Sequence, residues 1–404
     1  MLLLLMAVTP ATFAQVAKKR TISKGPRAVA LLQIADNGRA RLIPVTIMVN
    51  GDFYDAGAYK ADPVPMALQP ETVYEGVKAG IPQGLFTVGG AAQNNGNWFA
   101  DGKWETQAQL DADKAKAAAD LAKKNQTAPP DEELGGPPKL RRGPESSASG
   151  GSAPAQTSTS KPAPAPSSSK TEEQKPKSTG NAAYNSIDAP DRPILRREPA
   201  SGTTHEQMKS SPDTSPLSGP IQFVVAVSDA DGPQPRPYTF KMKPEEEANF
   251  QKKMLAMAAD EVKQRAGHLA GETIENGKNV GKSARATPEF HDVQMHVYDV
   301  STTNEAVLVL TGSATLPGDE RQYLVAVVAR QDIYGDLHTI FAQTTDNKHL
   351  DVLPRYDFID VVDADGDGRA ELLFRTTWDS GSAFSVYRVL GNRLWPLFEG
   401  KPGS

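Results

Sequence analysis

DFIDVVDADGDGRAELLFRTTW, residues 357–378, consists of two apolar stretches joined by an acidic loop that contains two glycines. The apolar stretches are short, rich in Val, Phe and Leu, and bounded by Asp and Gly, which is typical of β-strands joined by a tight turn. Two more stretches of the same kind, AFSVYRVLG (383–391) and RLWPLFEG (393–400), follow at once. Residues 357–400 therefore predict four consecutive short strands.

An earlier part of the chain resembles this unit. Aligning Asp299 with Asp363 places Ala306 on Ala370 without a gap. The four stretches of this first copy are VQMHVYDV (293–300), EAVLVLTGSA (305–314), QYLVAVVARQ (322–331) and LHTIFAQT (337–344). Tandem four-strand units are typical of blade-like sheets, but two units cannot close a propeller, which has about 4 to 8 blades. We expect a sandwich or curved sheet, with chance similarity between hairpins as the alternative.

One amphipathic helix is predicted in front of these two units. Pro244 suits the first turn of a helix, and the apolar residues from Phe250 to Val262 fall on one stripe at helical spacing. The apolar stretch IQFVVAVS (221–228) precedes the helix and predicts a further strand. The sequence thus predicts a β-rich C-terminal domain with one helix, over residues 220–400.

A smaller antiparallel β-domain is predicted over residues 27–104. Asp36-Asn37-Gly38 separates two apolar stretches, and Asn50-Gly51 ends the second of them. Asn-Gly between apolar stretches favours a hairpin, because both central residues of a type I′ turn need a positive φ. Pro44 has no amide hydrogen, so we expect it near a strand end or on a sheet edge. A small barrel or sandwich fits this length.

The end of this domain, QNNGNWFADGKW (93–104), reads as a loop that carries aromatic side chains among amides. Trp98, Phe99 and Trp104 could stack on a sugar or a partner surface while the neighbouring amides form hydrogen bonds. The alternative is that the tryptophans cap a small core, because Trp is highly buried on average.

Residues 105–219 predict a helical spacer followed by a disordered linker. The first part is rich in Ala, Lys and Asp without an apolar face, and the rest is rich in Pro, Ser and Lys. A chain segment with so few aromatic residues cannot bury enough apolar surface to offset the entropy of ordering. The related sequences LRRGP (140–144) and LRREP (195–199) are either docking motifs for a partner or chance repeats.

The N-terminal sequence MLLLLMAVTPATFAQ predicts export of the protein to the periplasm, the cell surface or the medium. An apolar run is followed by small residues at the spacing of a cleavage site, which indicates a signal peptide over residues 1–14; a buried first strand or helix is the alternative. No other segment is long and apolar enough to predict a transmembrane helix.

Charge and cysteine content narrow the function classes. The 404 residues carry a net charge of −5 with both signs interspersed, so nucleic acid is not an expected partner. The absence of Cys excludes disulfides, thiolate metal sites and cysteine nucleophiles.

The acidic loop predicts a cation site. Counting Asp363 as the first position, carboxylates stand at positions one, three, five and nine, and Gly366 allows a sharp turn at position six. Such hard oxygen ligands suit calcium, whereas four carboxylates without a cation repel one another. The alternative is a tight acidic turn in which Asp side chains accept hydrogen bonds from backbone amides.

The residues FIDVVDADGDGRAELLF (358–374) resemble the calcium-binding loop of FG-GAP and VCBS repeats, with weaker resemblance over about 356–398. These β-repeats occur in bacterial surface proteins and in the integrin head, where a β-hairpin loop wraps the ion. The resemblance implies a structural calcium ion as cofactor. The ligands that it implies are Asp363, Asp365, Asp367, Arg369 through its carbonyl group, and Glu371.

No catalytic motif stands out. The six histidines lack metalloenzyme spacing, and acidic pairs such as Asp357 with Asp360 cannot be told from solvated carboxylates. The first hypothesis is a non-catalytic binding or structural envelope protein that engages an unknown protein or glycan. The alternative is a hydrolase that acts on cell-wall or extracellular polymer.

Overall fold

The computed structural model describes residues 25–126, 215–228, 236–272, 274–275, 278–279, 281–301 and 303–402. The predicted signal peptide (1–14), residues 127–214 of the predicted linker and the motifs at 140–144 and 195–199 lie outside these residues. The described residues up to Ala117 and from Ser215 onward belong to one compact unit, which the following paragraphs describe. The helix α1 (Gln107–Gln126) runs from this unit into a second one; its side chains from 111 to 123 are exposed, as predicted for a solvated spacer.

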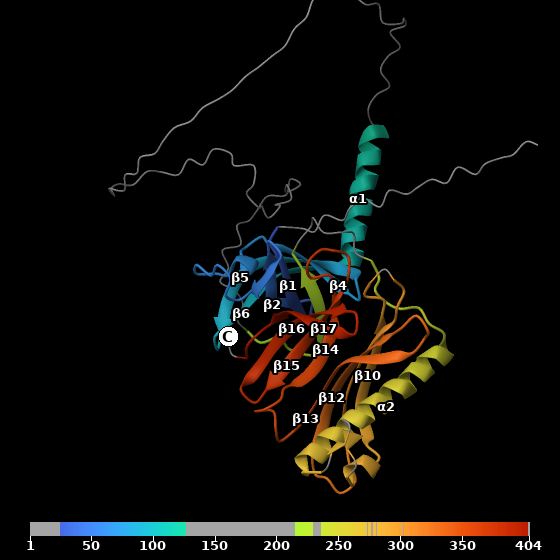
Figure 1. Ribbon diagram of the computed structural model, residues 1–404. Helices are drawn as coiled ribbons and strands as arrows, with labels where there is room; N and C mark the ends of the chain where they lie inside the picture. The colour runs from blue at the N-terminus through green and yellow to red at the C-terminus, as the bar shows by residue number, and fades with distance from the viewer. Residues whose placement is uncertain are drawn as a thin grey trace, which may run out of the picture. The chain divides into compact units, whose positions relative to one another are not determined.

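Six antiparallel strands close a barrel in the N-terminal part of the structure (Figure 1). They pair in the ring order β1, β7, β4, β5, β6, β2, and β2 pairs back with β1. Their bounds are β1 (Arg27–Ala35), β2 (Ala40–Val49), β4 (Val73–Lys78), β5 (Ile81–Asn94), β6 (Asn97–Thr106) and β7 (Ile221–Val227). The short strand β3 (Asp52–Asp55) adds to β2, and the 3₁₀-helix η1 (Met66–Leu68) precedes β4.

The strand β7 belongs to this barrel, which corrects the predicted start of the C-terminal domain at residue 220. It pairs with β1 from Val29 to Ala35 and with β4 from Glu75 to Val77. A barrel must pair every strand on both sides to remove its edges, and the strands before residue 107 leave one position in the ring open. The strand β7, which follows the predicted linker in sequence, therefore completes the barrel formed by the strands before residue 107.

Residues 93–104 form a β-hairpin, and not the predicted loop. The strands β5 and β6 meet at Asn95 and Gly96, whose φ angles are 52° and 83°. Two consecutive positive φ angles define the type I′ turn that Asn-Gly favours. The sequence therefore held the same hairpin signal here as at Asn50-Gly51, and the surrounding polar residues obscured it.

The C-terminal part contains the two predicted four-strand units, each an antiparallel meander. The first sheet consists of β10 (Glu289–Tyr298), β11 (Val307–Thr315), β12 (Gln322–Gln331) and β13 (Leu337–Asp346). The second consists of β14 (Arg355–Val362), β15 (Glu371–Trp378), β16 (Gly381–Leu390) and β17 (Arg393–Glu399). The predicted helix is α2 (Pro244–Leu269); two-residue strands β8 (Ile274–Glu275) and β9 (Lys278–Asn279) and the 3₁₀-helix η2 (Ser283–Arg285) follow it.

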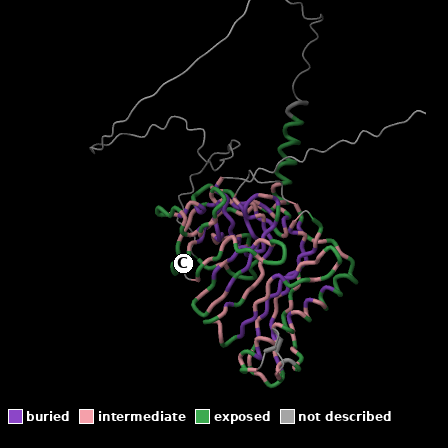
Figure 2. Tube along the Cα trace, in the orientation of Figure 1, coloured by how far each residue is buried: buried purple, intermediate pink, exposed green. Residues whose placement is uncertain are grey.

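The four elements pack in the order α2, first sheet, second sheet, barrel. The apolar stripe of α2, which includes Met254, covers one face of the first sheet, and the other face packs on the second sheet through Val309 and Phe374. The far face of the second sheet meets the outside of the barrel, where Leu373 contacts the cluster of Val225. The second sheet is therefore buried on both faces, as the purple segments of Figure 2 show for its inner strands.

The strands β1 and β7 are apolar on both faces for the same reason. On β1, Ala28 and Leu32 face the barrel core, whereas Val29 and Leu31 face the second sheet. Successive side chains of a strand point to opposite faces, so a strand between two cores is apolar throughout. This explains the uninterrupted apolar sequence at residues 28–32.

Candidate functional site

The predicted cation loop connects β14 and β15. Gly366 and Gly368 have φ angles of 74° and 81°, which side chains other than glycine rarely adopt, so the two glycines permit the loop's compact path. Three backbone amides donate hydrogen bonds to aspartate side chains. They are Gly368 N to Asp363 Oδ2 at 2.9 Å, Asp367 N to Asp365 Oδ1 at 3.2 Å and Arg369 N to Asp367 Oδ1 at 2.8 Å. The loop thus has the hydrogen bonds of a tight acidic turn.

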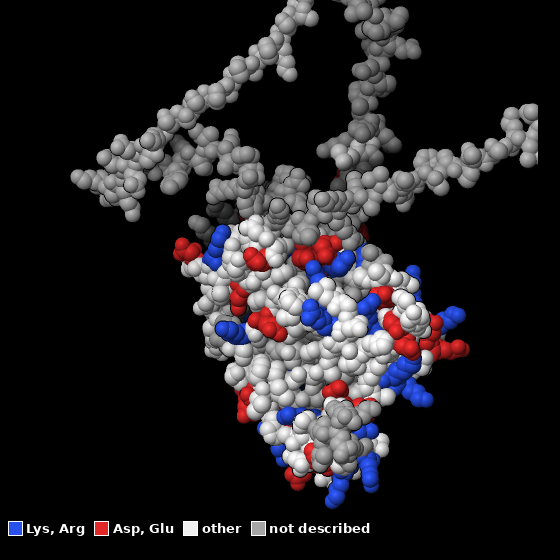
Figure 3. All heavy atoms as spheres, viewed as in Figure 1, with Lys and Arg blue, Asp and Glu red and all other residues white. Residues whose placement is uncertain are grey.

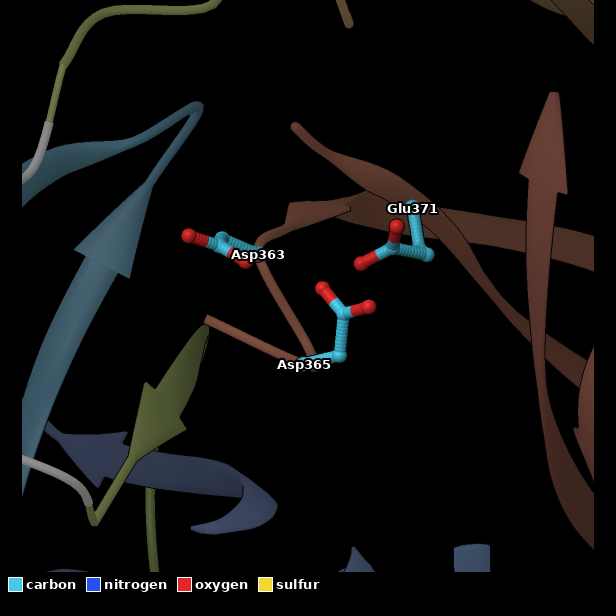
Figure 4. A group of neighbouring side chains, drawn as sticks. All are labelled: Asp363, Asp365 and Glu371. Atoms are coloured by element: carbon cyan, nitrogen blue, oxygen red, sulfur yellow. The ribbon is translucent and has the colours of Figure 1, made fainter. Parts of the chain in front are cut away.

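Three of the five predicted ligands converge. Asp363, Asp365 and Glu371 each offer a carboxylate oxygen, and these oxygens lie within 4.8 Å of one another. The carboxylates of Asp365 and Glu371 face each other in Figure 4. Asp367 is not part of this group of converging carboxylates.

Arg388 on β16 is the residue that the sequence prediction missed. Its Nη2 lies 2.6 Å from Asp365 Oδ2 and 2.6 Å from Glu371 Oε1, and its Nη1 lies 3.7 Å from Asp367 Oδ2. The antiparallel register that pairs Leu372 with Tyr387 places Arg388 beside Glu371. A register for the predicted hairpin would have found this cation, because neighbouring positions across strands interact.

Glu371 is fully buried and has strong partners. Its Oε2 accepts a hydrogen bond from Ala364 N at 2.8 Å, and Arg388 donates to Oε1 from Nε and Nη2. Burial raises the pKa of Glu371 to about 8, although the Arg388 guanidinium acts in the opposite direction. Burial also raises the pKa of Asp363, against the attraction of Arg27. Burial therefore favours the protonated form of both carboxyl groups, although each has an arginine nearby.

One carboxylate oxygen of the loop has no hydrogen-bond donor. Asp363 Oδ1 is buried, and within the described part of the chain no donor reaches it. A buried acceptor without a partner loses its hydration and gains nothing in return, at a cost of about 1–3 kcal/mol. The three converging carboxylates could hold a metal ion, which would give such an oxygen a partner.

Two further arginines tie the loop to other layers. Arg27 on β1 donates to the Asp363 carbonyl oxygen from Nη2 at 2.8 Å and from Nε at 3.1 Å. Arg236 donates to the carbonyl oxygens of Asp299 and Ser301 at 3.2 Å and 3.1 Å, and lies 3.5 Å from the Gly368 carbonyl oxygen. The loop is therefore a junction between the barrel and both C-terminal sheets.

The acidic pair on β14 has structural partners. Asp357 forms ion pairs with Arg355 at 2.7 Å and Arg375 at 3.3 Å. Asp360 is buried and accepts hydrogen bonds from Ala79 N and Val361 N, both at 2.8 Å. The Ala79 hydrogen bond links the second sheet to the turn between β4 and β5, whereas the Asp357 ion pairs lie within the second sheet.

The surface contains both signs of charge. Basic and acidic side chains are mixed on the face shown in Figure 3, with uncharged areas between them. Neither of the helices in the described residues has the length and apolar character needed to cross a membrane.

Comparisons of this chain with protein-family models, with curated proteins and with solved structures returned no match. The resemblance of residues 358–374 to FG-GAP and VCBS repeats therefore stays a prediction from the sequence.

Proposed function

We propose that this protein is an exported, non-catalytic binding or structural protein of the cell envelope whose C-terminal sheets are stabilised by calcium. The observation that carries the calcium assignment is the convergence of Asp363, Asp365 and Glu371, which each offer a carboxylate oxygen within 4.8 Å of the others. The buried Asp363 Oδ1, which has no hydrogen-bond donor among the described residues, supports it. The predicted signal peptide supports export. Export agrees with a calcium site, because extracellular modules bind calcium with dissociation constants of about 10⁻⁴ to 10⁻³ M.

Calcium would act against the charge repulsion of the loop. Asp363, Asp365, Asp367 and Glu371 carry four carboxylates, and Arg388 supplies one positive charge among them. A divalent cation held by these oxygens supplies the charge that is missing and favours the ionised form of each carboxyl group. Arg388 already contacts the carboxylates of Asp365 and Glu371, so the guanidinium and the ion compete for these two groups.

The position of the loop gives the ion a role in the whole unit. Arg27 fixes the loop to the barrel, and Ala370 N donates a hydrogen bond to the Val300 carbonyl oxygen in the corresponding loop of the first sheet, at 2.8 Å. Rigidifying this junction stabilises the packing of three layers at once. Calcium is therefore expected to raise the midpoint of global unfolding and not only to order one hairpin.

The test is thermal unfolding of the full chain in calcium, in magnesium and in chelator. At a calcium concentration about 100 times the dissociation constant, the expected stabilisation is about 2.7 kcal/mol. Asp365→Asn should abolish the calcium effect, because it removes one charged ligand. The matched control is Asp357→Asn on β14, which pairs with two arginines outside the loop and should leave the effect intact.

An unchanged midpoint in calcium would refute the proposed ion site. An equal response to magnesium would instead indicate general screening of the acidic loop, because calcium and magnesium differ in ligand number and geometry. Export is tested separately by comparing the cellular fractions that contain the full chain and a variant without residues 1–14.

A further inference from the structure

A cavity of about 480 Å³ lies between the barrel and the second sheet. It forms where β2 changes neighbours: residues Ala40–Leu42 pair with β6, and residues Thr46–Val49 pair with β3. Residues 43–45 lie between these two partner strands and line the cavity. Pro44 occupies the middle of this gap, where the absence of an amide hydrogen has the least consequence for pairing.

Gly57 lies close to two other lining residues of the cavity. A Cβ atom at Gly57 would lie 3.9 Å from both Pro44 Cγ and Trp98 Cδ1. The chain end lies against β16, since Gly400 N donates a hydrogen bond to the Phe384 carbonyl oxygen at 2.9 Å. The C-terminal end and β6 are thus brought to one place, which can be followed in Figure 1.

The apolar wall of the cavity is aromatic and held in place. Trp98 is half-buried and packs on the barrel core, whereas Phe384 and Phe398 pack on the core between the barrel and the second sheet. Side chains packed in this way can bind a ligand with little further loss of conformational freedom. Rigid aromatic surfaces of this kind favour flat apolar faces of a ligand.

The polar lining consists mainly of groups that exchange hydrogen bonds with hydroxyls. Gln93 and Asn97 come from the β5–β6 hairpin, and Ser382 comes from β16. Asp55 is oriented by its own backbone, since Oδ1 accepts a hydrogen bond from Gly57 N at 2.7 Å. Each amide both donates and accepts, and each carboxylate has two acceptor oxygens, so vicinal hydroxyls match them.

The ionised groups in the lining have no net charge. Asp55 and Lys401 contribute one charge of each sign, and they are the charged residues among the described residues that line the cavity. A ligand with a net charge therefore gains no general attraction there. Glycoside hydrolysis by the usual route requires two carboxyl groups flanking the bond, whereas Asp55 is the one carboxylate of the lining.

We propose that this cavity binds a neutral saccharide of one or two rings. The rings of Trp98, Phe384 and Phe398 receive the apolar faces of the sugar, and Gln93, Asn97 and Asp55 bind its hydroxyls. The volume lies in the range of about 300–1,000 Å³ found for small-molecule sites. The inference rests on the proposed binding function and names its ligand class, but it uses residues separate from the calcium loop.

The test is calorimetric titration of the full chain with defined sugars: glucose, galactose, N-acetylglucosamine, cellobiose, maltose and N,N′-diacetylchitobiose. Glucuronate serves as the charged comparator and should bind no better than glucose. Asn97→Ala should weaken binding about two- to tenfold, as expected for one lost hydrogen bond. Trp98→Ala should weaken it by about tenfold or more.

The matched control is Trp395→Ala, because Trp395 is an exposed tryptophan of β17 outside the cavity lining. The Trp395→Ala variant should bind each sugar with the same affinity as the unchanged chain. Because Trp98 also packs on the barrel core, Asn97→Ala keeps the test valid if Trp98→Ala does not fold. Asn97 is the exposed first residue of β6, and its replacement by alanine should leave the unfolding midpoint unchanged.

The inference would be overturned if the chain bound none of these sugars at millimolar concentration. It would also be overturned if the Asn97→Ala and Trp98→Ala variants bound them with the same affinity as the unchanged chain. Repeating the titration with Asp365→Asn separates the two proposals. This variant should keep the saccharide affinity of the unchanged chain and lose the calcium response. In the unchanged chain, saccharide binding without a calcium response supports the cavity and refutes the ion site. A calcium response without any saccharide binding does the reverse.

Discussion

Replacing Arg388 by methionine should make the stability of this protein depend on calcium. The guanidinium of Arg388 is the cation that contacts three carboxylates of the loop, at 2.6 Å from Asp365 and Glu371 and at 3.7 Å from Asp367. Methionine is similar in length and apolar, so it fills the space and leaves the carboxylates without their internal partner. Calcium then becomes the cation that can occupy the loop without competition.

The size of the effect follows from the burial of the pair. Removing one partner of a buried ion pair costs about 3–5 kcal/mol, because the remaining charges are left uncompensated. The lower end applies here, since the side chain of Arg388 retains 18% exposure and Glu371 can take up a proton. For an ordered unit of this size, each kcal/mol lowers the unfolding midpoint by about 2–4 °C, so the loss in chelator is on the order of 10 °C.

The assay is thermal unfolding of the Arg388→Met variant and the unchanged chain, each in chelator and in calcium. Calcium should restore about 2.7 kcal/mol to the variant at 100 times the dissociation constant. At that same calcium concentration it should stabilise the unchanged chain less, because the ion must displace the guanidinium from Asp365 and Glu371 and therefore binds more weakly. A variant that remains equally far below the unchanged chain in both conditions would refute the idea that arginine and calcium share one set of oxygens.

Three other perturbations test the pH response, the barrel and the layer packing. In chelator, the free energy of unfolding should fall as the pH rises from about 5 to 8. Burial raises the pKa of Glu371 from 4.5 to about 8, so in this range the folded state holds a proton that the unfolded chain has released. In denaturation curves measured across this pH range, Glu371→Gln should flatten the slope. Cutting the chain at a protease site inserted near residue 160 should leave two fragments that elute together in native size-exclusion chromatography, because β7 pairs with β1 and β4. Separate elution would show that the barrel is complete without β7. Leu373→Ala should lower the free energy of unfolding by about 2–5 kcal/mol in urea denaturation, because this fully buried side chain packs between the second sheet and the barrel. The control is Leu121→Ala on α1. This leucine is 62% exposed, so its replacement should change stability by less than about 0.5 kcal/mol.

Local signals predicted most of the elements. Turn residues and short apolar stretches were sufficient for the two four-strand units, and the stripe from Phe250 to Val262 was sufficient for α2. The hairpin at Asn95-Gly96 carried the same signal but was interpreted as a loop. Its strands are polar near the turn, and alternation is hard to recognise where few side chains face a core.

The acidic loop was predictable in composition but not in its partners. The spacing of Asp363, Asp365 and Glu371 indicated a cluster, and the structure brings these three together. Arg388 lies 17 positions after Glu371, and Arg27 lies 336 positions before Asp363. Their contribution depends on strand register and on packing between layers, neither of which a local sequence pattern specifies.

The sequence by itself determined which residues form strands and helices, because side-chain period, turn chemistry and capping act over a few neighbouring residues. Only the tertiary structure decided that β7 closes the barrel, that the second sheet is buried on both faces, and that Pro44, Trp98 and Phe384 meet around one cavity. Each of these results depends on contacts between distant segments, and many chain paths bury the same apolar residues equally well. The choice among them is made by the summed packing and pairing of the whole unit.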